Sequence, residues 1–190
     1  VLPLAATDLK QRSSSERVTS GNADLDRICG GGYFRDSIIL ASGATGTGKT
    51  LLTTEFIAGG IASNERCLLL GFEESHDQLV RNAEGWGHDY RKFERDGLLH
   101  VSCEYPEFRS LEDQLLRIKT IIEEFRPDRV AVDSLSALER TGSLKSFREF
   151  VLGLTAFIKE MEIPGLFTAS TSALMGGSSI TEAHISTITD

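Results

Sequence analysis

The sequence predicts an α/β fold in which a mostly parallel sheet carries helices on both faces. Apolar runs of strand length alternate with amphipathic segments of helix length through most of the 190 residues. These runs are apolar along most of their length, which is typical of strands buried on both faces. Helical segments of ten or more residues between them favour parallel pairing. With 40% hydrophobic and 25% charged residues, the composition suits one globular domain.

Strands and helices follow one another along the chain. Strands are expected at residues 37–42, 67–71, 98–103, 130–133 and 165–171. Helices are expected at residues 49–62, 75–86, 111–125 and 147–161. Ser75 is the expected N-cap of the second helix, and Pro164 ends the last one. Gly59 and Gly60 weaken the end of the first helix. The third helix is expected to bury one face, formed by Leu111, Leu115, Ile118 and Ile122.

The two ends of the chain differ from its middle. Residues 1–16 contain a serine triplet and no periodicity, and are expected to form a linker or N-terminal arm. The domain itself is expected to span residues 17–190. After residue 171 the chain is rich in Ser, Thr and Gly, without a further strand pattern. Because an α/β core of this kind normally continues, we expect the fold to be truncated at its C-terminus, with later strands missing.

Charge and cysteine content narrow the class of protein. The net charge of −8 makes nucleic acid an unexpected partner, because neutralising phosphates takes a concentrated excess of Lys and Arg. The three cysteines, Cys29, Cys67 and Cys103, are widely separated and are interpreted as buried thiols in a reducing cytosol. No apolar run approaches the ~20 residues needed to cross a bilayer, and the N-terminal apolar stretch is too short for a signal peptide. A cytoplasmic location without membrane contact is therefore expected.

The strongest motif is the segment GATGTGKT at residues 43–50, which fits the pattern G-x-x-x-x-G-K-[ST]. It follows a predicted strand directly and opens a predicted helix, so that backbone N–H groups can surround polyphosphate oxygens. Lys49 adds a positive charge for the β and γ phosphates, and Thr50 adds a hydroxyl for Mg²⁺. The alternative interpretation is a flexible glycine loop that matches by chance. The predicted ATP-binding residues in this region are Gly43, Thr45, Gly46, Thr47, Gly48, Lys49, Thr50 and Leu51.

Acidic residues follow two other predicted strands. Asp133 ends the run at 130–133 and is the candidate for holding magnesium through its water shell. Glu73 and Glu74 follow the strand at 67–71, at the same expected edge of the sheet. A carboxylate there can polarise a nucleophile, which is water in ATP hydrolysis and a Ser or Thr hydroxyl in protein phosphorylation. The alternative is that both glutamates are solvated charges at the end of a strand.

Aromatic and imidazole side chains carry weaker signals. Trp86 is the only tryptophan, and its ring either stacks on adenine or packs in the core. The four histidines have no metal-ligand spacing and are interpreted as structural or surface residues.

Nearly the whole chain resembles the KaiC family of cyanobacterial clock ATPases and autokinases, specifically the second, C-terminal ATPase repeat. The matching segments are QRSS, CGGGYFRDSIILASGATGTGKT, FEES, DSLSAL and the final SITEAHISTITD. The resemblance implies a RecA-like P-loop NTPase core. It also implies a hexameric ring that binds ATP and Mg²⁺ at subunit interfaces, and clock partners of the KaiA and KaiB type.

The resemblance assigns roles to individual residues as well. Ser186 and Thr187 match the hydroxyls that accept and return the γ phosphate from the adjacent subunit, and Thr181 matches an auxiliary phosphate position. Glu73 and Thr50 are implied near magnesium with Asp133. Glu74 is implied to act as general base, with Glu73 and Lys49 completing the catalytic set. Trp86 is implied to lie beside adenine.

Two alternatives to an ATPase with autokinase and autophosphatase activity remain open at this point. One is a DNA-dependent ATPase of the RecA or DnaB type, against which the acidity of the chain argues. The other is a regulatory scaffold that binds ATP mainly to hold its ring together.

Overall fold

The fold is organised around one parallel sheet. The computed structural model describes residues 14–106 and 109–171. Five strands form the sheet in the order β3-β7-β6-β4-β5, and every neighbouring pair is parallel. The strands are β3 (Ile38–Gly43), β4 (Cys67–Gly71), β5 (Leu99–Cys103), β6 (Arg129–Asp133) and β7 (Gly165–Ser170). The predicted parallel α/β sheet is confirmed, and each predicted strand lies within two residues of its expected bounds.

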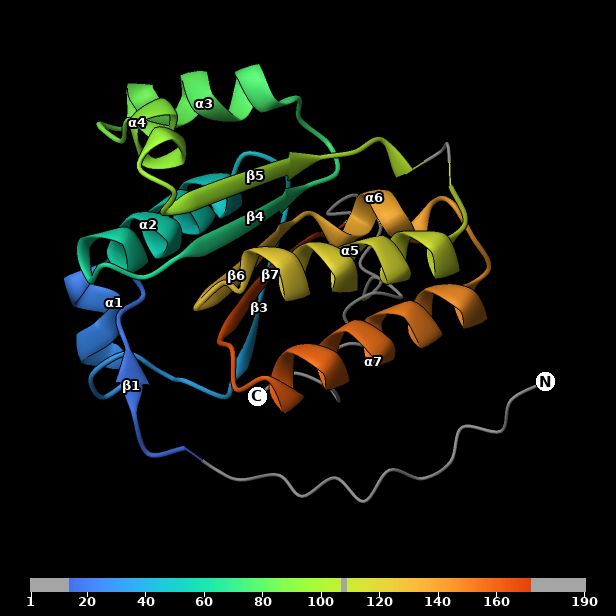
Figure 1. Cartoon of the computed structure of the whole chain (residues 1–190), viewed down its shortest axis with the longest axis horizontal. Helices are drawn as coiled ribbons and strands as arrows, with labels where there is room; N and C mark the ends of the chain where they lie inside the picture. Colours follow the sequence, from blue (N-terminus) through green and yellow to red (C-terminus); the bar gives the residue numbers. More distant parts are fainter. Residues whose placement is uncertain (1–13, 107–108, 172–190) are drawn as a thin grey trace.

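Helices cover both faces of this sheet (Figure 1). One layer holds α2 (Lys49–Ala62), α3 (His76–Gly85) and α4 (Tyr90–Arg95). The other holds α5 (Leu111–Phe125), α6 (Leu135–Glu139) and α7 (Leu144–Glu160). The predicted helices at 49–62 and 111–125 have these bounds, and Ser75 caps α3 as expected. The short helices α4 and α6 were not predicted.

Successive side chains of a strand alternate between the two helix layers. In β4, Leu68 and Leu70 belong to the core under α5, α6 and α7, while Cys67 and Leu69 belong to the core under α2, α3 and α4. Successive side chains of a strand point to opposite faces, so a strand buried on both faces must be apolar throughout. This is why β4 reads as an unbroken apolar run.

A small unit precedes the sheet and was not predicted. It consists of β1 (Arg17–Val18), β2 (Tyr33–Phe34) and, between them, α1 (Ala23–Ile28). The two strands pair antiparallel, and Asn22 caps α1 by accepting hydrogen bonds from two backbone N–H groups. Elements of two to six residues carry too little periodicity to be recognised in a sequence.

One helix start differs from expectation, and a pair of glycines has a role that was not predicted. Helix α2 passes through Gly59 and Gly60 and ends at Ala62 as predicted. Their role is close packing, because a Cβ atom at Gly60 would lie 2.4 Å from Nε of Arg129. Helix α7 begins at Leu144, three residues earlier than predicted, because Ser143 caps it by accepting a hydrogen bond from the backbone N–H of Ser146.

The cysteines are free thiols, as predicted, but only Cys67 is fully buried. Burial raises the pKa of the Cys67 thiol to about 12 and that of Cys103 to about 11. Cys29 and Cys103 are half-buried, which corrects the expectation that all three are enclosed.

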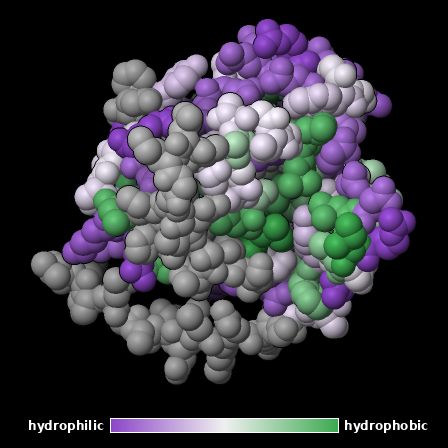
Figure 2. Space-filling view, turned by 180° about the vertical axis from the view of Figure 1, so that it is seen from behind, coloured by the Kyte–Doolittle hydropathy of each residue, from purple (hydrophilic) through white to green (hydrophobic). Residues whose placement is uncertain are grey.

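The surface is mixed in polarity. Figure 2 shows apolar side chains gathered on the face seen from behind, among hydrophilic residues. Ile28 is 79% exposed and Phe34 is 43% exposed. Within residues 14–106 and 109–171, no helix has the length and apolar character needed to cross a bilayer.

Candidate active site

The segment at residues 43–50, which we call the phosphate loop, joins β3 to α2. Gly48 is the N-cap of α2 with φ of 89°, and Gly46 has φ of 84°. Both values lie in the left-handed region that favours glycine. The backbone N–H of Thr47 donates to the carbonyl of Ala44 at 3.3 Å, which closes the turn. The loop therefore lies at the start of a helix of 14 residues, where N–H groups and the helix dipole favour an anion.

Lys49 lies over the phosphate loop. Its Nζ donates to the carbonyl oxygens of Gly43 at 2.8 Å and Ala44 at 2.9 Å. These partners are neutral carbonyl oxygens, and a phosphate oxygen can replace them with an acceptor that also carries a negative charge. Thr50 and Leu51 follow in the first turn of α2, and Leu51 is 37% exposed.

The acidic residues meet at the carboxyl ends of β4 and β6, which are neighbours in the sheet. Gly71 pairs with Asp133 in the parallel register, and the N–H of Phe72 donates to the Asp133 carbonyl at 2.9 Å. Glu73 and Glu74 follow directly. Asp133 Oδ1 accepts a hydrogen bond from Thr168 Oγ1 at 2.5 Å, which orients its carboxylate. The peptide bond that follows Asp133 is cis.

The environment of Glu74 differs from that of Glu73. Burial, and next the negative charge of Asp133, raise the pKa of Glu74 above its ordinary value. Its Oε2 accepts a hydrogen bond from Asn82 Nδ2 at 2.8 Å. Glu73 is exposed and lies 3.5 Å from the guanidinium of Arg140, itself on the surface. The raised pKa suits Glu74 to accept a proton, whereas Glu73 is exposed on the same side of the strand end.

These residues fit a nucleotide with magnesium. Thr50, Glu73 and Asp133 offer only oxygen atoms, which Mg²⁺ prefers. Mg²⁺ commonly keeps several waters and takes few protein ligands. The described part of the chain contains no group of three His, Cys, Asp or Glu residues close enough to enclose a metal.

Trp86 lies outside the core. It is the C-cap residue of α3 and is 40% exposed, so the core-packing alternative is excluded. His88, two residues later, places its Nε2 atom 3.2 Å from Oε1 of Glu55 on α2. Leu51 and Glu55 are four residues apart and share one face of α2. The segment that carries Trp86 therefore lies on the helix face that begins at the phosphate loop.

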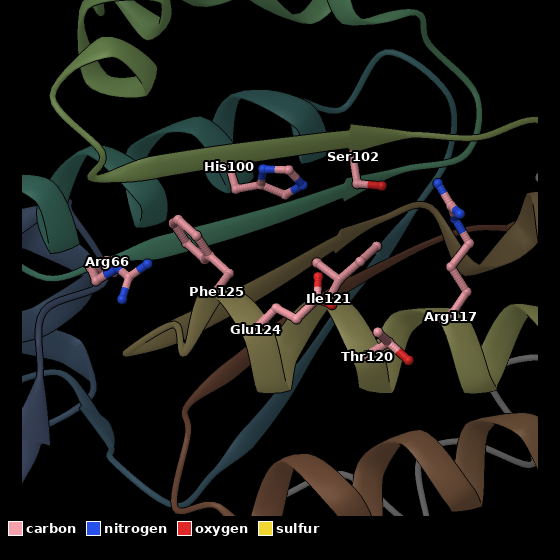
Figure 3. A pocket seen from close by; sticks show the side chains of 8 residues that line it. All are labelled: Arg66, His100, Ser102, Arg117, Thr120, Ile121, Glu124 and Phe125. Atoms are coloured by element: carbon pink, nitrogen blue, oxygen red, sulfur yellow. The ribbon is translucent and has the colours of Figure 1, made fainter.

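A separate groove lies between β5 and α5 (Figure 3). It has a volume of about 650 Å³ and contains no residue predicted for nucleotide binding. Arg66 stacks over the ring of Phe125 at 4.3 Å, and His100 lies against the same ring with centroids 5.4 Å apart. The groove is on the α5 side of the sheet, whereas α2 with its phosphate loop lies on the other side.

The predicted phosphate acceptors fall outside the described residues. These are Ser186, Thr187 and Thr181. The linker or arm at residues 1–16 is described only from Ser14 onward, and the proposed boundaries stay predictions.

Three polar partners of the predicted acidic site residues were not predicted: Asn82, Thr168 and Arg140. The pair of His88 with Glu55 beside Trp86 was not predicted either. The contact of Asn82 could have been predicted from helix spacing. Asn82 lies seven residues after the N-cap Ser75, and so on the face of α3 that starts beside Glu74. Thr168 and His88 meet their partners through contacts distant in sequence.

Comparison with known proteins agrees with this geometry. The family model described as "ATPase: KaiC" matches residues 18–189. The chain belongs to the KaiC family. Its fold is accordingly that of a RecA-like P-loop ATPase domain, as predicted.

Relatives within the KaiC family are similar along the whole chain. The "Circadian clock protein KaiC3" of Synechocystis sp. is 63% identical over 190 residues. The "Circadian clock oscillator protein KaiC" of Thermostichus vulcanus is 57% identical, and that of Picosynechococcus sp. is 55% identical. All 190 residues align in each case, but they cover only 38%, 37% and 37% of these relatives. The chain thus spans well under half the length of the KaiC proteins that it matches.

Proposed function

We propose that this chain is the second, C-terminal ATPase repeat of a KaiC-type clock protein, acting as an ATPase and a serine/threonine autokinase. The observation that carries the proposal is a carboxylate with a raised pKa, Glu74, at the sheet edge that also holds the phosphate loop. An ordinary surface glutamate lacks this environment. Perturbed carboxylates beside an anion site are typical of catalytic acids and bases.

Each group of residues has a different role in the proposed phosphoryl transfer. The amides of the phosphate loop and Lys49 bind the β and γ phosphates and offset their charge. Thr50, Asp133 and Glu73 hold Mg²⁺, which neutralises charge on the phosphate oxygens. Glu74 accepts the proton of the attacking hydroxyl through its Oε1 atom, while Asn82 donates a hydrogen bond to Oε2.

The nucleophile decides the outcome. With water the reaction is ATP hydrolysis, and with a side-chain hydroxyl it is protein phosphorylation. We propose Ser186 and Thr187 of a neighbouring subunit as acceptors and Thr181 as an auxiliary position. The same arrangement allows the reverse transfer back to the nucleotide. The similarity to clock oscillator proteins, and the match of the family model up to residue 189, support this choice.

We further propose a hexameric ring with ATP at its subunit interfaces. Exposed apolar side chains, of which Ile28 is the most exposed, support a surface that contacts other copies. Clock partners of the KaiA and KaiB type and a cytoplasmic location belong to the same proposal. The names of the relatives support the connection with a clock.

Phosphate mapping tests the activity. The chain is incubated with ATP and magnesium, ADP is measured, and phosphorylated residues are located by mass spectrometry. We expect phosphate on Ser186 or Thr187, absent in Lys49→Ala and Glu74→Gln. Glu149→Gln, at an exposed carboxylate on α7, is the matched control and should behave as the parent. Mass photometry with and without ATP measures ring assembly.

Four outcomes separate the alternatives. Phosphate that is lost in both variants supports the autokinase. ADP formation without phosphate on the chain contradicts the autokinase and leaves an ATPase. Binding of ATP without turnover favours a scaffold, and salt-sensitive DNA binding without phosphorylation favours a motor of the RecA type.

A further inference from the structure

The loop that carries Trp86 is attached to two different helices. On the α3 side, the N–H groups of Trp86 and His88 donate to the Ala83 carbonyl at 3.0 and 2.9 Å. Gly87, between them, has φ of 91°, which turns the chain sharply at the end of the helix. On the α2 side, the contact is made by the side chain of His88.

That second attachment is a half-buried pair. Nε2 of His88 lies 3.2 Å from Oε1 of Glu55, and the side chains are 23% and 30% exposed. The carboxylate only accepts, so the ring nitrogen carries the proton. Partial removal from water strengthens such a bond relative to one on the open surface.

The position of Glu55 links the pair to the phosphate loop. Glu55 is five residues after Thr50, which is about 7.5 Å along a helix axis. It also shares a face of α2 with the exposed Leu51. The loop held by His88 thus lies beside the first two turns of α2, and it carries the exposed indole of Trp86.

We propose that Glu55 and His88 are positioning residues that hold the Trp86 loop against α2 so that the indole borders the base of the bound nucleotide. This rests on the proposed nucleotide function of the phosphate loop. The pair acts on affinity through Trp86 and takes no part in transfer of the phosphate. Its loss therefore weakens nucleotide binding and leaves the chemical step unchanged.

The competing explanation is that the His88–Glu55 pair does not affect the position of Trp86. Tyr90 is 1% exposed and could anchor the loop alone through burial. A partly exposed pair of this kind would then contribute little, as many surface pairs do. The two explanations differ in whether the environment of Trp86 depends on His88.

Trp86 is the only tryptophan, so its fluorescence reports on this loop alone. The variants are His88→Ala, Glu55→Ala and the double substitution. His88→Gln tests rescue, because its amide can still donate to Glu55. His76→Ala is the matched control, since His76 pairs with Glu94 at 2.9 Å within the α3–α4 layer and does not reach α2. Iodide quenching is measured without nucleotide, followed by ATP affinity and single-turnover rate.

We expect the two alanine variants to increase quenching of Trp86 and to weaken ATP binding about three- to tenfold. The single-turnover rate at saturating ATP should stay unchanged. The double variant should be no worse than either single variant, because both remove the same contact. His88→Gln should recover most of the affinity, and His76→Ala should match the parent.

Unchanged quenching in His88→Ala, or additive effects in the double variant, would overturn the proposal. A parent chain that binds no ATP would instead contradict the proposed function. In that case the quenching measured without nucleotide still decides whether His88 holds the loop.

Discussion

Replacing Arg129 should unfold the domain at much lower temperature, although this residue is remote in sequence from the phosphate loop. Its side chain is 1% exposed. Its Nε donates to Oε2 of Glu65 at 2.7 Å, and its Nη1 donates to the carbonyls of Thr19 and Phe56 at 3.0 and 2.8 Å. The guanidinium carbon also lies 4.7 Å from the Phe56 ring centroid. One buried cation therefore joins β6, α2 and the segment before α1.

The cost of Arg129→Met follows from these partners. Two carbonyl groups lose their donor, at about 1–3 kcal/mol each when they stay dry. Removing one member of a buried ion pair costs about 3–5 kcal/mol. Glu65 keeps a second partner, Arg35, at 3.0 Å, which favours the lower end of the range for the ion pair. The lower values of the three terms add to about 5 kcal/mol, comparable with the whole stability of many domains.

Thermal and urea unfolding followed by circular dichroism measure this loss. At about 2–4 °C per kcal/mol for a domain of this size, the midpoint should fall by roughly 10–20 °C. Arg35→Met is the matched control, because Arg35 pairs with the same glutamate but is 26% exposed. It should cost about 1 kcal/mol or less. Arg129→Lys keeps a charge, so its loss of stability should lie between those of Arg129→Met and Arg35→Met. It replaces Arg129→Met as the test variant if Arg129→Met does not fold. Equal losses of stability in Arg129→Met and Arg35→Met would refute the argument that the buried cation of Arg129 holds these three segments together.

Two further predictions concern stability. Glu74→Gln should raise the unfolding midpoint at neutral pH, because burial and the charge of Asp133 disfavour the ionised carboxylate in the folded state. Since the folded pKa is raised, this gain should shrink as pH falls through that pKa and vanish below the ordinary value of 4.5; a gain that grew in acid would contradict it. Gly60→Ala should destabilise the domain by about 1–3 kcal/mol, because its Cβ would lie 2.4 Å from Nε of Arg129. Gly85→Ala, also in a helix but with no atom within 4 Å of the added Cβ, should stabilise by about 0.4–1 kcal/mol in urea titrations. Equal losses of stability in Gly60→Ala and Gly85→Ala would contradict the explanation that Gly60 is needed for close packing against Arg129.

The strands and the phosphate loop could be predicted because their signals are local. An unbroken apolar run such as Leu68 to Leu70 has few alternatives to a strand buried on both faces. The phosphate loop needs glycine at positions of positive φ, and Gly46 and Gly48 have this geometry. Asp133 could be placed from its position at the end of a strand alone.

Features that depend on distant contacts could not be predicted. Gly60 reads as a helix breaker until Arg129 is known to pack against it. Thr168 is an ordinary strand residue by pattern, and its bond to Asp133 depends on β6 and β7 being neighbours. His88 lacks metal-ligand spacing and was interpreted as structural or surface, whereas its partner Glu55 is 33 residues away.

Strand order explains why several strands must contribute to this site. β7 lies between β3, which leads into the phosphate loop, and β6, which ends in Asp133. At about 4.8 Å per strand, β6 is roughly 10 Å from β3, and β4 with its two glutamates is roughly 14 Å away. In the proposed function, a polyphosphate held by the loop would therefore pass across the end of β7 to reach the carboxylates. That end consists of small residues, Ala169 and Ser170, while Thr168 one step back holds Asp133. In the proposed function, the intervening strand would face the ligand with small residues while Thr168 orients the carboxylate of Asp133, a role visible only once the order of the strands is known.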